Sequence, residues 1–479
     1  MNYQEVRLSK LREWEAKQGV AYPDSFEVQY NTVQARELPE DGKLIKVAGR
    51  IMLMRVIGKL AFAQLKDFHG KIQLAFKVDT LGQETFAFYE KNLDLGDIVG
   101  VEGELFTTNK GEKTIEVHSF TLLSKCLHPL PEKWHGLVDE EQCLRQRYLD
   151  LLVNDHTLTK FKMRNTIIST IRNYLQNNQF IEVETPILQK QASGALATPF
   201  QTHHKALDIP LFMRIAPETY LKRLIVGGYE RVFEIGKSFR NEGVDSSHLQ
   251  EFTMLEFYCA YWNYHSAIEF VENIFKTVFS VLNIDVKNVQ YLEHTIDFSF
   301  PWEKITYRDL VLKYTGLDLE LYLDDEEELL KQLSKFIDVR EYKSLASAID
   351  ALYKKLCRPN LINPCIVTNQ PAVLGPLARM NDAKPMWSDR FQVVVCGLEI
   401  VNSYSELVDP IKQRTILEKQ KELSKKGEEE AMEMEDDFLL AMEYGMTPMA
   451  GVGIGIDRVI SLITNSNSLR DVVFFPSLR

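Results

Sequence analysis

The stretch Ser238-Phe-Arg-Asn-Glu-Gly243, followed by Glu251-Phe-Thr-Met-Leu-Glu-Phe-Tyr258, places charged side chains among aromatic ones. A strand is predicted over most of the second stretch. It would turn Glu256 and Tyr258 to one face, because side chains two residues apart on a strand point the same way. An arginine fork binds a carboxylate or a phosphate through two parallel hydrogen bonds. For any one of these charges alone a structural ion pair is the default interpretation, so the rest of the chain has to decide.

A second segment carries polar residues at the end of an apolar run, Arg390-Phe-Gln-Val-Val-Val-Cys-Gly-Leu-Glu-Ile-Val-Asn-Ser-Tyr-Ser-Glu406. We predict a strand that delivers Glu399 and then Asn402, Tyr404 and Glu406. Two carboxylates beside an aromatic ring suit a cationic ligand, because charge pairing fixes the head group and the ring covers an alkyl stem. An edge strand carrying surface acids is the alternative interpretation.

The third segment is Gly451-Val-Gly-Ile-Gly-Ile-Asp-Arg458, which alternates glycine with apolar residues before a predicted helix. Taken alone, the glycines favour tight packing of a strand against a helix over phosphate binding. Arg458, at the start of the helix, could clamp a triphosphate. The sequence contains no Walker phosphate loop and no dinucleotide fingerprint.

Upstream of these segments, the region from Leu44 to Leu123 has a β pattern in which short apolar runs alternate with turn signals. A helix is predicted near Glu84–Asn92, between the third and fourth strands, which is the order of an OB-fold barrel. Small barrels of this kind bind single-stranded nucleic acid by stacking bases on aromatic rings. The predicted strands are Leu44–Val56, Ala61–Asp67, Ile72–Lys77, Ile98–Phe106 and Thr114–Leu123.

The 479-residue chain is too long for one hydrophobic core, so two or more domains are expected. A net charge of −12 argues only weakly against nucleic acid, because phosphate binding depends on the local potential. The acidic runs Asp324–Glu328 and Glu428–Asp437 are interpreted as solvated surface. The six dispersed cysteines favour a reduced, cytoplasmic protein without structural zinc, and no apolar run is long enough to predict a membrane span.

From Phe180 onward, extended runs alternate with helices, and neighbouring runs lie close in sequence, which favours an antiparallel sheet. An amphipathic helix over Leu158–Leu175 precedes them. The region 265–385 is interpreted as a helical and β insertion to which no chemistry is assigned. The extended runs include Leu211–Ile215, Arg231–Ser238, Thr253–Tyr261, Arg390–Val401 and Ala450–Gly455.

The three polar segments, with Phe180-Ile-Glu-Val-Glu-Thr-Pro-Ile-Leu188 before them, resemble the signature motifs of class II aminoacyl-tRNA synthetases. The resemblance runs from about residue 40 to Arg479. Further phrases resemble the lysyl branch of that family: Gln146–Asp150, Thr202–His204, Arg214–Glu218, Leu221–Gly228, Phe239–Gly243 and Gly453–Arg458.

The resemblance implies an α+β fold, with an N-terminal OB-fold β-barrel followed by a class II synthetase antiparallel β-sheet domain flanked by helices. It implies ATP-dependent ligation of L-lysine to tRNA(Lys) through a lysyl-adenylate. A homodimer is implied through the segment that carries Pro186, and neither DNA nor a membrane is an expected partner. The expected parts are a helical extension at 1–40, the anticodon-binding barrel at 41–125, a linker at 126–154 and the catalytic domain at 155–479.

The resemblance also implies roles for individual residues. The catalytic residues would be Arg240 and Arg458. The residues expected to bind ATP are Arg240, Glu242, His248, Phe252, Glu399 and Arg458, and Glu399 would also bind Mg²⁺. The residues expected to bind lysine are Gly194, Glu218, Glu256, Tyr258, Asn402, Tyr404 and Glu406. The residues expected to bind the anticodon are Phe62, Gln73 and Arg50, with Arg55 as the alternative to Arg50.

The expected chemistry agrees with these roles. The lysine carboxylate is already anionic when it attacks the α-phosphate, so this step needs no general base. It needs position and positive charge, which Arg240, Arg458 and Mg²⁺ would supply.

The chain departs from the family pattern at several positions. Gln392 stands where the family usually has a second acidic metal ligand; a neutral amide is a weaker magnesium ligand, so the number of bound ions stays open. Ser193, Thr198 and Ser119 also replace usual residues, the last of them near the site for the third anticodon base. Three alternatives stay open: a sister synthetase for aspartate or asparagine, a paralogue that aminoacylates a protein, and a non-catalytic RNA-binding protein.

Overall fold

The computed structural model describes residues 2–131, 137, 139–191, 194–195, 197–243, 245–425, 432 and 434–478. The chain divides into two compact units, Met1–Val138 and Asp139–Arg479, and each is described by itself. Within the described residues, no helix combines the length and the apolar character that a membrane crossing requires.

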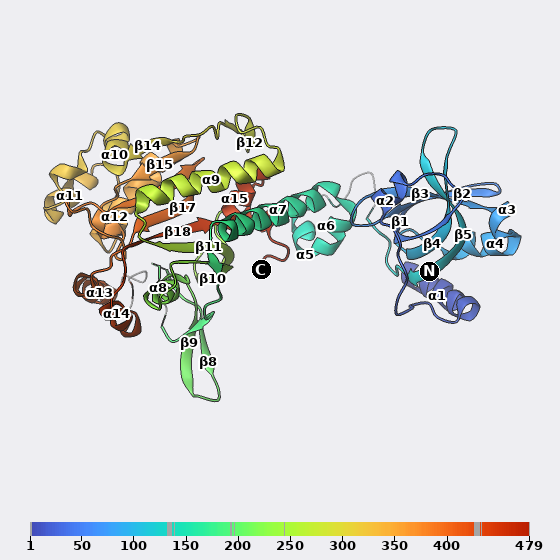
Figure 1. The fold of residues 1–479 in the computed structure, drawn as a ribbon, viewed down its shortest axis with the longest axis horizontal. Helices are drawn as coiled ribbons and strands as arrows, with labels where there is room; N and C mark the ends of the chain where they lie inside the picture. Colours follow the sequence, from blue (N-terminus) through green and yellow to red (C-terminus); the bar gives the residue numbers. More distant parts are fainter. Residues whose placement is uncertain are drawn as a thin grey trace. The chain divides into compact units, whose positions relative to one another are not determined.

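The first unit is built on a closed five-stranded barrel with the strand order β1-β2-β3-β5-β4 (Figure 1). Inward-facing Ala61, Ala63 and Leu65 alternate with half-buried residues, as expected for a strand with one face in the core. Five strands with a helix between the third and fourth is the arrangement that the sequence predicts. The elements are β1 (Leu44–Ile57), β2 (Leu60–Lys66), β3 (Lys71–Lys77), α3 (Val78–Leu81), α4 (Gln83–Asn92), β4 (Ile98–Thr107) and β5 (Lys113–Ser124).

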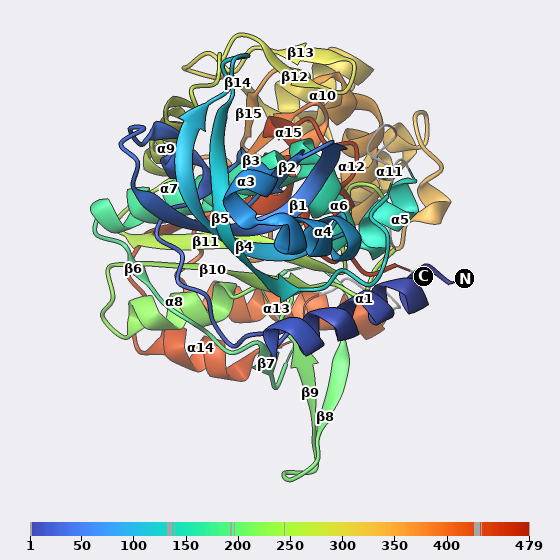
Figure 2. The same ribbon diagram turned by 90° about the vertical axis from the view of Figure 1, so that its right-hand side faces the viewer.

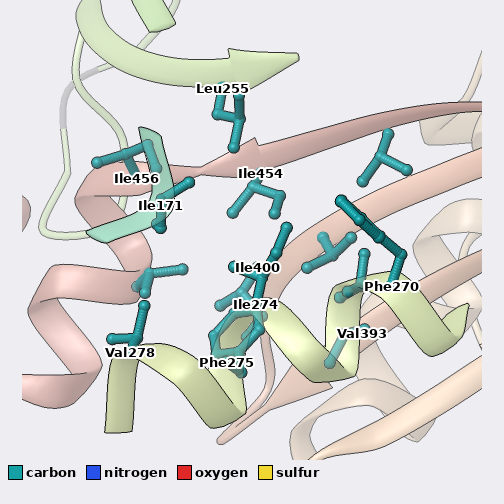
Figure 3. Close-up of a cluster of buried hydrophobic side chains, with 14 of the residues drawn as sticks. Ile171, Leu255, Phe270, Ile274, Phe275, Val278, Val393, Ile400, Ile454 and Ile456 are labelled. Carbon is teal, nitrogen blue, oxygen red and sulfur yellow. The ribbon is translucent and has the colours of Figure 1, made fainter. Parts of the chain in front are cut away.

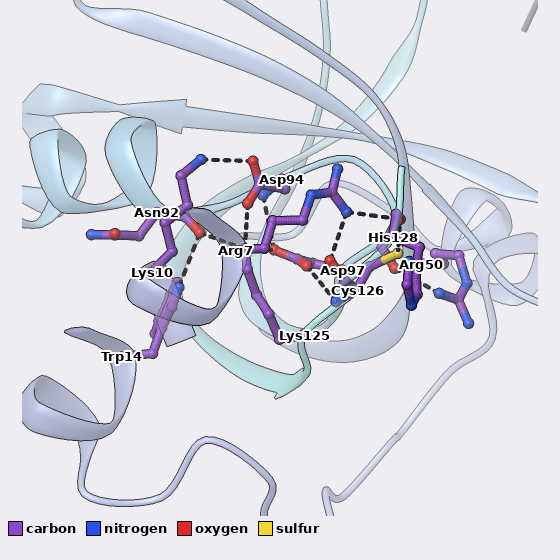
Figure 4. Close-up of polar contacts among 11 residues, drawn as sticks. Arg7, Lys10, Trp14, Arg50, Asn92, Asp94, Asp97, Lys125, Cys126 and His128 are labelled. Atoms are coloured by element: carbon purple, nitrogen blue, oxygen red, sulfur yellow. Dashed lines mark hydrogen bonds and ion pairs between the residues drawn. The ribbon is translucent and has the colours of Figure 1, made fainter. Parts of the chain in front are cut away.

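Two helices, α1 (Tyr3–Gln18) and α2 (Thr32–Glu37), precede the barrel and belong to the same unit. Trp14 of α1 is fully buried, and its Nε1 donates to the Asn92 carbonyl at 3.2 Å. Nearby, the buried Lys125 ammonium donates to Asp94 at 2.6 Å and to Asp97 at 2.7 Å (Figure 4). Lys10 of α1 also donates to Asp94, so one carboxylate joins the helix to the barrel.

Replacing Lys125 by Met should destabilise the first unit by about 3 kcal/mol, because the buried Asp97 and the half-buried Asp94 would lose their shared cation. Hydrogen exchange of peptides from β4 and β5, followed by mass spectrometry in the full chain, measures this loss. Lys91→Met is the matched control, since Lys91 makes an exposed ion pair with Glu13 and should change exchange little. Equal exchange in the two variants would contradict a structural role for Lys125.

The second unit contains an eight-stranded sheet with the order β14-β15-β16-β17-β18-β11-β10-β6. All neighbouring pairs from β15 to β10 are antiparallel, as predicted; the two edge pairs, β14–β15 and β10–β6, are parallel. The strands are β6 (Ile181–Glu182), β10 (Arg231–Phe239), β11 (Glu251–Ala260), β14 (Glu303–Thr306), β15 (Cys365–Thr368), β16 (Arg390–Val395), β17 (Leu398–Ser405) and β18 (Met449–Gly455).

One expectation about the sheet is wrong. The run Arg390–Val401, predicted as one strand, is a tight hairpin made of β16 and β17. Its turn lies at Cys396 and Gly397, which both have positive φ, of 46° and 69°. Two consecutive residues in that conformation reverse the chain with a twist that matches the strands.

One face of the sheet packs against α7 (Asp155–Asn177), α9 (Tyr264–Leu282) and α15 (Ile456–Ile463). Figure 3 shows Phe275 and Ile274 of α9 meeting Ile400 and Ile454 of the sheet. This large core leaves the opposite face of the central strands free to carry polar side chains.

Smaller elements surround the sheet. The insertion contributes α10 (Tyr307–Thr315), α11 (Glu326–Leu333) and α12 (Leu345–Leu352), which share a separate apolar cluster. A three-stranded sheet in the order β7-β9-β8 projects from the unit (Figure 2). The remaining elements are α5 (Glu140–Arg145), α6 (Arg147–Val153), β7 (Leu188–Gln189), β8 (Gln201–His204), β9 (Ile209–Met213), α8 (Glu218–Val226), β12 (Val289–Tyr291), β13 (His294–Ile296), α13 (Pro410–Lys425) and α14 (Asp436–Glu443).

Candidate active site

The central strands β11, β18 and β17 place the predicted polar residues over one row of glycines. In the strand register Gly451 lies between Tyr258 and Tyr404, and Gly453 lies between Glu256 and Asn402. Gly451 has no room for a side chain, because a Cβ there would overlap Glu406 Oε1 and the Tyr258 ring. Glycine in β18 therefore lets the side chains of both neighbouring strands meet above it.

All thirteen residues that the sequence analysis assigns to lysine or ATP line a single cavity on this face of the sheet. They come from segments far apart in the chain, which supports the idea that they act together. They are Gly194, Glu218, Arg240, Glu242, His248, Phe252, Glu256, Tyr258, Glu399, Asn402, Tyr404, Glu406 and Arg458.

Three buried carboxyl groups, of Glu218, Glu256 and Glu406, mark the acidic part of the cavity. The Tyr258 hydroxyl donates to Glu256 Oε2 at 3.0 Å, and the Tyr404 hydroxyl donates to Glu218 Oε1 at 2.6 Å. The pKa of Glu256 is raised to about 8, mainly because the carboxyl group is buried and secondly because Glu218 repels its negative charge. Acids brought together this closely favour a ligand that carries positive charge.

Two arginines supply the basic part of the cavity. The Arg240 guanidinium lies 5.2 Å from the centroid of the Phe252 ring. Its Nε is buried and has no hydrogen-bond partner among the described residues. Arg458 donates to the Glu399 carbonyl at 2.8 Å, and burial lowers the pKa of its guanidinium. Two arginines facing one cavity suit an anionic ligand such as a phosphate chain.

His248 and Glu242 are the more exposed members of the predicted ATP set. His248 Nδ1 lies 2.8 Å from Asp245 Oδ2, and its Nε2 lies 3.5 Å from the Arg458 guanidinium. The imidazole is therefore held between an acid and one of the arginines.

Glu399 is a carboxylate that could contribute to a magnesium site completed by substrate phosphates. Gln392 Nε2 donates to Glu399 Oε2 at 2.5 Å, and the Tyr353 hydroxyl donates to Gln392 Oε1 at 3.3 Å. The described residues contain no group of three or more His, Cys, Asp or Glu side chains able to hold a metal alone. Mg²⁺ commonly takes one or two carboxylates together with substrate phosphates and water.

Two residues beside the cavity were not among the sequence predictions. Lys222 of α8 lies between Glu218 and Glu406, at 2.5 Å from a carboxylate oxygen of each. Its spacing of four residues from Glu218 is the one available signal, but that spacing is also typical of ordinary helix ion pairs. Arg390 Nε donates to Asn402 Oδ1 at 2.9 Å and so orients that amide.

The three predicted anticodon residues lie on the barrel in the first unit. Phe62 is half-buried on β2, opposite Ala75 of β3. Gln73 donates to Thr114 at 2.9 Å, and Arg50 donates to the Gly96 carbonyl at 2.6 Å. Arg50 is thus already engaged by the barrel, whereas Arg55, its predicted alternative, is exposed. Ser119, another departure from the family pattern, contacts Glu102 at 3.4 Å.

Comparison with known proteins agrees with this geometry. The family described as tRNA synthetases class II (D, K and N) matches residues 139–479, and the OB-fold nucleic acid binding domain matches residues 45–123. The chain is 46% identical to a lysine–tRNA ligase of Aquifex aeolicus over 91% of this chain and 73% of that protein. It is 44% identical to one from Syntrophomonas wolfei over 99% of this chain and 96% of the relative.

A third relative, the heat-inducible lysine–tRNA ligase of Escherichia coli K12, is 42% identical over 99% of this chain and 95% of its own length. Both units of the chain are thus matched by family and by full-length relatives. The chain belongs to the class II aminoacyl-tRNA synthetases and, within them, to the lysine–tRNA ligase family.

Proposed function

We propose that the chain activates L-lysine with ATP in this cavity and transfers the lysyl group to tRNA(Lys). The observation that carries the proposal is the set of three buried carboxyl groups and two tyrosines in a cavity that also has two arginines. Such a cavity complements an amino acid with a cationic side chain at one end and an anionic nucleotide at the other.

In this proposal the lysine carboxylate meets Arg240 and its α-ammonium meets Glu218, beside Gly194. The side-chain ammonium lies among Glu256, Tyr258 and Glu406. Asn402 and Tyr404 flank the alkyl stem, which loses water on binding. Burying an ammonium is costly unless carboxylates compensate it, and the buried acids here are equally in need of a cation.

The first step forms a bond between the lysine carboxylate and the α-phosphorus of ATP and breaks the bond to the β-phosphate, so pyrophosphate leaves. Arg240 and Arg458 would stabilise the negative charge that develops on the phosphates. Mg²⁺, held by Glu399 and phosphate oxygens, would shield the charge of the departing pyrophosphate. In the second step a terminal hydroxyl of the tRNA attacks the lysyl carbonyl, and AMP leaves.

The adenine ring would stack on Phe252, with Glu242 and His248 near the base and the phosphate tail. The barrel would bind the anticodon through Phe62 and Gln73, with Arg50 or Arg55 near the phosphates. For Arg50 this requires exchanging its bond to the Gly96 carbonyl, so Arg55 is the better placed of the two.

The homodimer belongs to the same proposal. Ile181, Ile187 and Leu188, around the segment that carries Pro186, are large apolar side chains left exposed in the single chain. A cytoplasmic location is supported by the six cysteines, which are all free thiols.

Aspartate or asparagine fits this cavity poorly, because three buried carboxyl groups would repel the aspartate side chain and offer no positive charge to it. Lys222, the cation beside Tyr404, is already paired with two carboxylates. ATP–pyrophosphate exchange with each amino acid tested separately decides the question. Exchange with lysine supports the proposal, and exchange with aspartate or asparagine instead would overturn it.

Replacing Glu406 by Gln should raise the KM for lysine by about 100-fold in the exchange assay, because a buried ammonium would lose a charged partner. The KM for ATP should stay within about threefold, since Glu406 is assigned no ATP contact. Glu269→Gln, an exposed position on α9, is the control and should change neither constant. An unchanged KM for lysine in Glu406→Gln would remove Glu406 from the lysine site.

Replacing Gly451 by Ala should raise the KM for lysine at least about tenfold, because the new methyl group displaces Glu406 or Tyr258. Gly453→Ala is the matched control on the same strand. A Cβ at Gly453 meets nothing nearer than 3.8 Å, so the KM for lysine should change far less. Equal effects of the two substitutions would contradict the close approach at Gly451.

Replacing Phe62 by Ala should lower kcat/KM for tRNA charging by about ten- to 100-fold, since one stacked base is worth about 1–3 kcal/mol. Lysine-dependent ATP–pyrophosphate exchange should be unchanged, because activation does not involve the anticodon. Phe68→Ala, an exposed ring outside the predicted contact, serves as the control. A parallel loss of exchange and charging would indicate damage to the fold rather than to anticodon binding.

A further inference from the structure

Lys222 is a buried cation beside the proposed lysine-binding cavity. Its side chain is 1% exposed, and its Nζ lies 2.5 Å from Glu218 Oε1 and 2.5 Å from Glu406 Oε2. The ammonium also lies 5.6 Å from the Tyr404 ring and 5.8 Å from the Phe438 ring. A lysine side chain of the protein thus occupies a position between two acids proposed to bind the substrate.

The carboxylates are not satisfied by Lys222 alone. Glu406 Oε1 is buried and has no hydrogen-bond donor among the described residues. Glu256 is 4% exposed, and its carboxyl group accepts a hydrogen bond from the Tyr258 hydroxyl. Both side chains line the cavity, so their unused acceptor capacity is available to a ligand there.

Counting charges shows what the ligand has to supply. Glu218, Glu256 and Glu406 would contribute three negative charges when ionised, and Lys222 contributes one positive charge. The difference is two negative charges, which matches the two ammonium groups of lysine. The third charged group of lysine, its carboxylate, is assigned to Arg240.

We propose that Lys222 is a specificity-determining positioning residue: a built-in counter-ion that orients Glu218 and Glu406 and sets the charge of the cavity to accept two ammonium groups. This rests on the proposed function. Lys222 acts through the carboxylates and does not itself touch the reacting atoms.

The charge balance couples lysine binding to proton release. Without ligand, the pKa of Glu256 near 8 keeps this carboxyl largely protonated at neutral pH, because burial and Glu218 both oppose its charge. Burial lowers the pKa of the Lys222 ammonium, but Glu218 and Glu406 more than offset this and raise it, so Lys222 stays charged. Arriving ammonium groups favour ionised Glu256, so binding tightens as the pH rises through about 8.

The charged and titratable groups around Lys222 come from several elements. Beyond Glu218 and Glu406, the groups around Lys222 include one more glutamate and two tyrosines. Two arginine–glutamate ion pairs also lie on neighbouring helices and strands. These groups are Glu256 and Tyr258 of β11, Tyr404 of β17, the pair Arg214–Glu234 and the pair Arg223–Glu435. In each pair the arginine neutralises its own glutamate, although Glu234 still adds to the raised pKa of Glu256. Among the described residues, Lys222 is the cation paired directly with Glu218 and Glu406.

Two substitutions separate the charge of Lys222 from its shape. Lys222→Met keeps an unbranched side chain but removes the charge, whereas Lys222→Arg keeps the charge and changes the shape. In Lys222→Met the KM for lysine should rise at least about tenfold at pH 7. The ratio of this KM to the wild-type KM should fall toward about pH 8.5, because the acids ionise as the pH rises. Lys222→Arg should retain the wild-type pH profile even where its KM is raised.

The assay is lysine-dependent ATP–pyrophosphate exchange from about pH 6.5 to about pH 8.5, a window in which Glu256 titrates. The KM for ATP in the same experiments reports the integrity of the nucleotide site. Lys276→Met on α9, an exposed lysine outside the cavity, is the matched control. If all four proteins share one pH profile for lysine, the proposal is overturned.

A measurement on the unmodified protein is independent of how the variants fold. Burial raises the pKa of Glu406 as well as that of Glu256, although Lys222 partly opposes the shift at Glu406. Calorimetric titration with L-lysine in two buffers of different ionisation enthalpy at pH 7 should therefore show a net release of protons on binding. Binding without proton release would overturn the charge-balance argument. A wild type that shows no lysine-dependent exchange would refute the proposed function instead, so the two failures are distinguishable.

Discussion

The close packing of β18 between β11 and β17 is the constraint on which the rest of the site depends. Side chains alternate between the two faces of a strand. On one face of β18, Val452 and Ile454 fill the core against α9 and α15, as Figure 3 shows for Ile454. On the other face, Gly451 and Gly453 leave space, and the acids and tyrosines of the flanking strands occupy it. One strand thus supports both the core and the cavity.

The acidic and the basic side chains lie in different parts of the cavity. The acids and tyrosines belong to β11, to β17 and its end, and to α8, whereas Arg240 follows β10 and Arg458 lies in α15. Glu218 lies in the first turn of α8, where the helix dipole favours a negative charge. In the proposed binding mode, a zwitterion with an extra ammonium group would lie with its carboxylate toward the arginines. That orientation would bring the nucleophile to the phosphates before any bond is made.

The sequence allowed much of this to be predicted, because the relevant signals are local. The two-residue period of Glu256 and Tyr258 correctly put both on the cavity face, while Phe257 between them is buried in the core. The hairpin at Cys396 was missed because it interrupts an apolar run without an Asn-Gly or Asp-Gly signal. Lys222 was missed because its pairing with Glu406 joins residues far apart in the chain, which only the tertiary fold can bring together.

Gln392 illustrates how a departure from the family pattern can be compatible with the same chemistry. A carboxylate at this position would repel Glu399 and would need a cation between the two groups. The Gln392 amide instead donates to Glu399, and the Tyr353 hydroxyl fixes the amide from its other side. The protein's own side chains therefore hold Glu399 in place. Mg²⁺ bound with the ATP phosphates would meet a carboxylate that is already oriented, which would lower the entropic cost of assembling the site.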